Sequence, residues 1–99
     1  MGATTPEGLV KAGIKKVLND MGAWYFMPTM AGYGRAGIPD FIVCLKGRFL
    51  AIEAKRPGGK TTAWQDRELA AIQAAGGEAM VINDPETLRE MLAEISHEG

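Results

Sequence analysis

The dipeptide Lys46-Gly47, set between two runs of apolar residues, constrains the fold of this chain more than any other feature. The runs Phe41–Leu45 and Phe49–Ile52 are rich in β-branched, aromatic and aliphatic side chains, which is typical of strands. A two-residue loop ending in glycine suits a primed turn, because Gly47 can take the positive φ that such a turn requires. The sequence therefore predicts a β-hairpin with its turn at Lys46-Gly47.

The register of this hairpin has a chemical consequence at its open end. If Leu45 pairs with Arg48, counting back along both strands places Asp40 directly opposite Glu53, on one face of the sheet. Like charges about 4.5–5.5 Å apart destabilise a sheet, so this pair is an odd choice for structure alone. Carboxylates at that separation suit Mg²⁺ or Mn²⁺, and Lys55 on the same face can hold or polarise a metal-bound water. We therefore predict a metal site here, with a solvated charge cluster as the alternative.

The motifs around this predicted site resemble those of a known family. Pro39-Asp40 and Glu53-Ala54-Lys55 match the core motif of the PD-(D/E)XK nuclease superfamily. More narrowly, nearly the whole chain resembles the virus-type replication-repair nuclease (VRR-NUC) domain. The motifs that carry the narrower resemblance are Gly34-Arg35, Gly37-Ile38-Pro39-Asp40, Glu53-Ala54-Lys55, Gly59-Lys60 and Gln65.

The resemblance implies an activity and two further site residues. It implies a DNA endonuclease with a restriction-endonuclease-like fold, suited to branched DNA such as four-way (Holliday) junctions. In this family an acid on the first helix joins the metal site, and Glu7 is the acid that can match; from the residues alone, Glu7 fits a capping box with Thr4 or a first-turn acid. Members also place a glutamine beside the catalytic residues. Gln65 matches it, and a capping-box role with Thr62 can coexist with that one.

Periodicity and helix signals supply the other elements. Together with the hairpin they give the order αβββαβα, which predicts an α/β fold with a mixed β-sheet flanked by helices. The length of 99 residues predicts a single domain over residues 1–99. The expected elements are a helix from Thr4 or Thr5 to Gly22 with Lys11 on its outer side, a strand over Ala23–Met27, a helix from Thr62 to Ala75, a strand over Glu78–Asn83 covered on both faces, and a helix after Asp84-Pro85.

Charge is distributed unevenly along the chain. The net charge of −1 argues, taken globally, against a nucleic-acid binder. Residues 31–60, however, carry basic side chains against only two acids, which are the proposed metal ligands, whereas the chain from Asp66 onward is mostly acidic. The basic segment 31–60 is therefore predicted to face DNA phosphates. The expected DNA contacts are Arg35 and Tyr33 in the glycine-rich loop before the site, and Arg56 and Lys60 in the basic loop after it.

Several classes of protein are excluded by composition. No apolar run approaches the roughly 18 residues of a membrane span, and the N-terminus does not read as a secretory signal. A cytoplasmic location is therefore expected, and the resemblance is compatible with a viral or phage origin. One cysteine and one histidine exclude a disulfide framework and a standard zinc site, and Cys44 is expected in the core.

The small size of the chain predicts a partner. A chain of 99 residues offers a narrow basic face, whereas a junction needs two opposed cuts, so we expect a symmetric homodimer with one site per subunit. The alternative to a nuclease is a non-cleaving nucleic-acid-binding or assembly module on the same fold. Residues that fit either a dimer interface or the monomer core are Trp24, Phe26, Met27, Met30 and Trp64.

Overall fold

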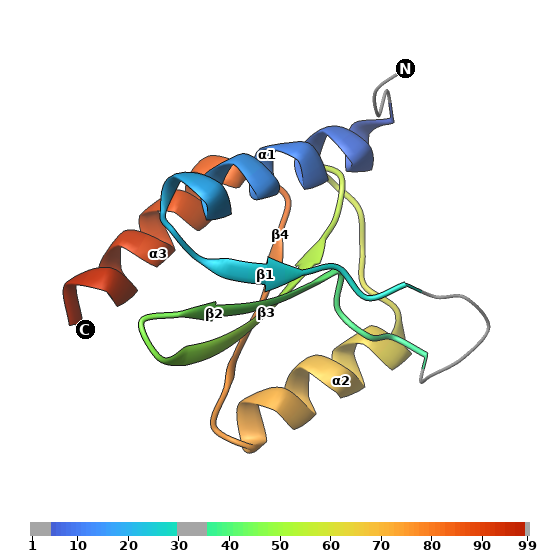
Figure 1. Cartoon of the computed structure of the whole chain (residues 1–99). Helices are drawn as coiled ribbons and strands as arrows, with labels where there is room; N and C mark the ends of the chain where they lie inside the picture. The colour runs from blue at the N-terminus through green and yellow to red at the C-terminus, as the bar shows by residue number, and fades with distance from the viewer. Residues whose placement is uncertain (1–4, 30–35, 99) are drawn as a thin grey trace.

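The structure is a computed structural model that describes residues 5–29 and 36–98. Its elements follow the predicted order αβββαβα (Figure 1). Within the described residues, no helix is long and apolar enough to cross a membrane. The elements are α1 (Pro6–Asp20), β1 (Trp24–Phe26), β2 (Phe41–Leu45), β3 (Arg48–Ala54), α2 (Ala63–Ala74), β4 (Glu78–Ile82) and α3 (Pro85–Glu98).

The four strands form one mixed sheet in the order β1-β2-β3-β4. The first three strands are antiparallel, and β4 lies parallel to β3 because α2 carries the chain back across the sheet. Figure 1 shows α1 and α3 side by side over one face of the sheet and α2 on the other face. The predicted α/β fold, a mixed sheet flanked by helices, is confirmed.

The central hairpin has the predicted turn and register. Lys46 and Gly47 both have positive φ, 54° and 78°, as a primed turn requires. Leu45 pairs with Arg48, and the pairing continues to Phe41 opposite Ile52. The ladder of paired residues ends there, so the segment before Phe41 leaves β2 at the end of the sheet that carries the predicted site.

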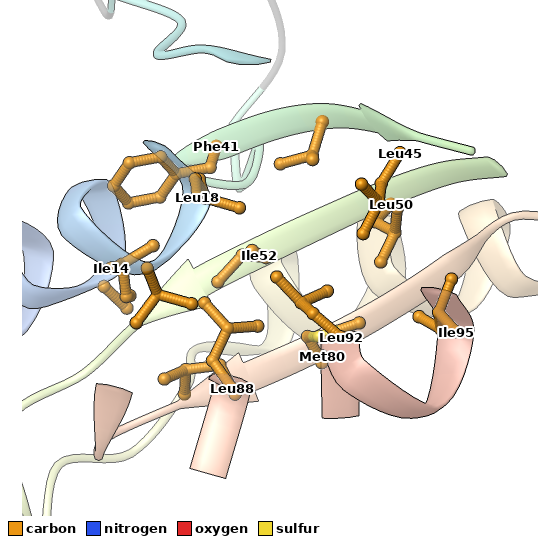
Figure 2. Close-up of a cluster of buried hydrophobic side chains, with 14 of the residues drawn as sticks. Ile14, Leu18, Phe41, Leu45, Leu50, Ile52, Met80, Leu88, Leu92 and Ile95 are labelled. Carbon is orange, nitrogen blue, oxygen red and sulfur yellow. The ribbon is translucent and has the colours of Figure 1, made fainter. Parts of the chain in front are cut away.

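The main core lies between the sheet and the two helices α1 and α3. Figure 2 shows apolar side chains from α1, the central strands and α3 meeting in one cluster, as the helical and strand periodicities predict. The close contact of the two helices needs a glycine on α1, because a Cβ at Gly13 would overlap the ring of Pro85. Fully buried members of the cluster include Ile14, Leu18, Phe41, Leu50, Ile52, Leu88 and Leu92.

The opposite face of the sheet is only partly covered. The helix α2 packs on β3 and β4, and among the described residues the part of this face formed by β1 and β2 is left largely uncovered, with Trp24 and Phe26 exposed. Cys44 is therefore exposed, and the prediction that it lies in the core is wrong. The prediction that the strand at 78–83 is covered on both faces is also wrong, because β4 is an edge strand and Val81 remains exposed.

Candidate active site

Asp40 is held at the open end of the hairpin by the backbone of β3. Its Oδ2 accepts a hydrogen bond of 2.9 Å from the backbone N–H of Ala54. The segment leading to Asp40 passes against the start of α2 at Gly37, which has a φ of 84°. A side chain at Gly37 would overlap the backbone carbonyl of Trp64, so only glycine fits there. Asp40 is thus fixed by β3 and by the approach of its own loop to α2.

Glu53, near the end of β3, is the most unusual side chain of the protein. It is a carboxylate on a residue only 2% exposed. Its Oε2 accepts a hydrogen bond of 3.0 Å from Gln65 Nε2 and lies 3.6 Å from Lys55 Nζ. Its Oε1 is buried and has no hydrogen-bond partner among the described residues. An unsatisfied buried carboxylate oxygen is costly, so this atom makes Glu53 a candidate ligand for a positively charged group.

The electrostatic environment of Glu53 disfavours its ionised form. Burial, and next the negative charge of Asp40, raise the pKa of Glu53 to about 7, while Lys55 opposes the shift. A protonated Glu53 can also donate a hydrogen bond to the Asp40 carboxylate, which raises the pKa further. The two carboxylates are therefore brought together as predicted, and together they attract a cation or a proton.

Gln65 links the start of α2 to this pair of carboxylates. Its Oε1 accepts from the backbone N–H of Thr62 at 2.9 Å, and the Thr62 hydroxyl accepts from the Gln65 N–H at 3.2 Å. This is the predicted capping box, and it orients the amide so that Nε2 donates to Glu53. The cap and the contact with the site coexist in one side chain, as the sequence allowed.

Glu7 reaches the site only through a lysine. The N-cap of α1 is Thr5, whose hydroxyl accepts from the Gly8 N–H, so Glu7 is a first-turn acid and not part of a capping box with Thr4. Lys11 Nζ lies 3.5 Å from Glu7 Oε2 and 3.6 Å from Asp40 Oδ1. The expectation that Lys11 lies on the outer side of α1 is therefore wrong: it bridges the helix to the site.

Lys11 is the residue of the candidate site that sequence reasoning missed. Its spacing of four residues from Glu7 signals an ion pair along α1, and that part was available from the sequence. The contact with Asp40 joins residues that are 29 positions apart in the sequence. It depends on how α1 crosses the sheet, which no local pattern reports.

Among the described residues, the acidic side chains of Asp40 and Glu53 are gathered at this end of the sheet. Within residues 5–29 and 36–98, no three histidine, cysteine or acidic side chains are grouped so that they could hold a metal ion. Mg²⁺ usually takes one or two carboxylates and completes its shell with water and phosphate oxygens. Asp40 and Glu53, with the unsatisfied Oε1, therefore fit such an ion, and ligation by Glu7 stays a prediction.

The four predicted DNA contacts divide into two groups, and two other basic residues of 31–60 belong to neither. Arg56 and Lys60 are exposed on the loop between β3 and α2, next to Lys55, as expected. Lys46 and Arg48 lie at the turn end of the hairpin, so the basic residues of 31–60 do not form one face. Arg48 instead pairs with Glu78 at 2.7 Å. Arg35 and Tyr33, like the candidate interface residue Met30, lie outside the described residues.

Comparisons with known proteins bear on this arrangement. No family model matches the chain. It is 38% identical over 64 residues to "Putative nuclease p44" of Acyrthosiphon pisum secondary endosymbiont phage 1, covering 64% of this chain and 68% of the phage protein. A solved structure described as a VRR_NUC domain superposes with a TM-score of 0.77 at 24% identity, covering 91% of this chain and 97% of that one. The chain therefore belongs to the same family as the phage protein p44, and it has the fold of the VRR-NUC domain that its motifs resemble.

Proposed function

We propose that this protein is a nuclease that hydrolyses phosphodiester bonds of DNA with the help of Mg²⁺ or Mn²⁺. The observation that carries the proposal is the buried Glu53, whose Oε1 has no hydrogen-bond partner among the described residues and which lies beside Asp40. Family membership supports the same reading, because the phage relative is named as a nuclease. A purely structural charge cluster would be expected to leave its carboxylates in water, and Glu53 is not in water.

In this proposal Asp40 and Glu53 hold the metal ion. A bound divalent cation would acidify water and offset the negative charge of the scissile phosphate. Asp40 keeps its orientation through the Ala54 N–H, and Glu53 keeps its orientation through the Gln65 amide. The protein therefore presents two fixed carboxylates, which lowers the cost of ordering them when the ion binds.

Lys55 is the proposed orienting group for the attacking water. Its side chain is 14% exposed and its Nζ lies 3.6 Å from Glu53 Oε2, so the ammonium faces the site and not the solvent. An ammonium has three donors and no acceptor, so it can hold a water oxygen and still contact a carboxylate. Hydrolysis joins that oxygen to phosphorus and breaks one P–O ester bond. One product strand then ends in a phosphomonoester, and the other ends in a hydroxyl that takes up the proton lost by the water.

A cleavage assay across metal ions tests the proposal. Supercoiled plasmid and a labelled four-way junction are incubated with Mg²⁺, Mn²⁺, Ca²⁺ or EDTA. We expect cutting in Mg²⁺ or Mn²⁺, little turnover in Ca²⁺ and none in EDTA. Cutting that persists in EDTA contradicts the metal-dependent site. Binding of DNA without cutting under every condition supports instead the non-cleaving module.

Branched DNA, with four-way junctions as the example, is the proposed substrate, and it rests on the family resemblance. A panel of linear, flapped, forked and four-way DNA of matched length separates these substrates. We expect the four-way DNA to be cut fastest. Equal rates on the linear duplex and the junction contradict the proposed preference for branched DNA.

A symmetric homodimer is the proposed working form, because a junction needs two opposed cuts. The open part of the sheet supports it: Trp24 and Phe26 are exposed on the edge strand β1, with ring centroids 5.8 Å apart. Met27, by contrast, is partly buried and packs against the core. We expect sedimentation at micromolar protein to give a dimer, and Trp24→Ala to weaken it. A monomer that cuts both strands of a junction contradicts the proposal.

A further inference from the structure

Trp64 is an exposed aromatic residue placed beside the candidate active site. It lies in the first turn of α2 and its residue surface is 57% exposed. Its chain neighbour Gln65 donates to Glu53, and its backbone carbonyl packs against Gly37 on the loop that leads to Asp40. The backbone of Trp64 is thus fixed between the two segments that supply the carboxylates, while its indole faces solvent.

A positively charged side chain, that of Arg67, lies over the indole ring of Trp64. The Arg67 guanidinium lies 5.2 Å from the ring centroid, one turn further along α2. The nearby acid Asp66 is turned to the loop, where its Oδ1 accepts from the Thr61 hydroxyl at 2.6 Å. Two shallow hollows border the ring, one lined by Ala36, Trp64, Arg67 and Glu68 and the other by Ala63, Trp64 and Arg67.

We propose that Trp64, with Arg67, is a stacking platform for an unpaired nucleobase of the DNA substrate, next to the phosphate that is cut. This inference rests on the proposed nuclease function and deepens it. An aromatic face stacks on any base, and a neighbouring guanidinium adds attraction for the phosphate backbone. Arg56 and Lys60 are exposed on the loop that joins Lys55 to α2, so two further basic side chains lie on the segment between the candidate site and Trp64.

The platform would select DNA by structure and not by sequence. A base inside a continuous duplex is already stacked on its neighbours, so it gains nothing from Trp64. A base at a gap, flap or branch point has lost a neighbour, and stacking on the indole replaces the lost contact. Trp64 would therefore favour DNA with unpaired nucleotides at the cleavage point.

A contact between two copies of this chain is the other use for an exposed tryptophan. The position of Trp64 favours the nucleobase, because its backbone lies against the loop that leads to Asp40 and its ring carries Arg67. The exposed pair Trp24 and Phe26 lies on the edge strand β1 and is the better candidate for a contact between copies.

Binding without cutting tests the platform. Fluorescence anisotropy in EDTA, and again with Ca²⁺, compares a duplex with a short gap of unpaired thymidines and a fully paired duplex of equal length. We expect Trp64→Ala to weaken binding of the gapped DNA about tenfold and to leave the paired duplex within about twofold. Trp64→Phe, which keeps an aromatic face, should retain most of the preference. Thermal unfolding checks that the variants are folded.

A spectroscopic readout tests stacking directly. The chain has two tryptophans, so Trp24→Phe leaves Trp64 as the only indole while keeping a ring on β1. We expect oligothymidylate to quench the emission of this variant, and the paired duplex to quench it far less.

Each outcome has one meaning. If the wild type binds DNA but Trp64→Ala keeps the full preference for the gapped DNA, the platform is wrong and the nuclease function stands. If Trp64→Ala loses both DNAs equally and sediments as a smaller species, Trp64 is a contact between copies and the platform is wrong. If the wild type neither binds nor cuts any DNA, the proposed function fails and the platform fails with it.

Discussion

At each end of the β2–β3 hairpin a glutamate, Glu53 of β3 or Glu78 of the neighbouring β4, lies beside a basic side chain, and the two pairs differ in exposure. At the turn end Arg48 Nη1 and Glu78 Oε2 are 2.7 Å apart, on side chains 41% and 39% exposed. At the open end Lys55 Nζ and Glu53 Oε2 are 3.6 Å apart, on side chains 14% and 3% exposed. Water solvates the first pair, and it is largely excluded from the second.

This difference shows why a count of charges does not locate a site. The charges of Arg48 and Glu78 at the turn end pair with each other, and the pair contributes little to stability, as is usual for exposed ion pairs. The open end has a second carboxylate, Asp40, and a buried Glu53 oxygen without a hydrogen-bond partner among the described residues. The two ends therefore differ in burial and in unsatisfied charge, and substitutions at the two ends should have different effects.

The largest expected difference is in DNA cleavage. We expect Glu53→Gln to lower the cleavage rate by at least about 100-fold, because it removes a charge that holds the metal ion. Asp40→Asn and Lys55→Gln should have effects of the same order. The matched control, Glu78→Gln at the turn end, should cut within about twofold of the wild type. Equal losses for Glu53→Gln and Glu78→Gln in a nicking assay would show that the two ends do not differ.

The next effect concerns stability in the absence of metal, where Glu53→Gln should make the protein more stable. Burial and the charge of Asp40 raise the pKa of Glu53 from near 4.5 to about 7. Between these values the unfolded chain loses the Glu53 proton while the folded chain keeps it, so the free energy of unfolding falls as pH rises. Above a pH of about 7 Glu53 is ionised in the folded chain too, and the full cost of its buried charge is present. Glu53→Gln should therefore increase stability by roughly 1–3 kcal/mol at alkaline pH.

Denaturant unfolding in EDTA at acidic and alkaline pH measures this effect. The gain for Glu53→Gln should vanish at acidic pH, where Glu53 is protonated in both folded and unfolded chains. Glu78→Gln should instead cost less than about 1 kcal/mol at alkaline pH, and less in high salt. A Glu53→Gln variant that is less stable than the wild type at alkaline pH would refute the idea of an unfavourable buried charge.

The smallest effect separates the two roles of Gln65. Thr62→Ala removes the hydroxyl that accepts from the Gln65 N–H, which is one half of the capping box. Gln65→Ala removes the other half, the acceptor for the Thr62 N–H, together with the contact with Glu53. Each should cost about 1 kcal/mol of stability, but only Gln65→Ala should also lower the cleavage rate, by roughly tenfold. Thermal unfolding and nicking rates on both variants measure this. Similar cleavage by the two variants would mean that Gln65 serves α2 alone.

The features that could be predicted from the sequence are those set by nearby residues. Lys46-Gly47 determines the turn, the turn determines the register, and the register brings Asp40 toward Glu53. The pattern Thr62 to Gln65 likewise encodes the capping box. Each of these follows from residues a few positions apart, or from counting along paired strands.

The features that the sequence did not reveal depend on how distant elements pack. Lys11 reaches Asp40 because of the path of α1 over the sheet. Cys44 and Val81 are exposed because α2 covers only part of its face, and strand patterns cannot report how much a helix covers. The degree of burial of Glu53, which distinguishes it from Glu78, is a property of the assembled fold.

Anomalous diffraction from crystals grown with Mn²⁺ tests the central claim most directly. If the open end of the hairpin is a metal site, the strongest manganese peak lies between the carboxylates of Asp40 and Glu53, and it disappears in Glu53→Gln but not in Glu78→Gln. A strongest peak at any other position, or one that persists unchanged in Glu53→Gln, would contradict the account.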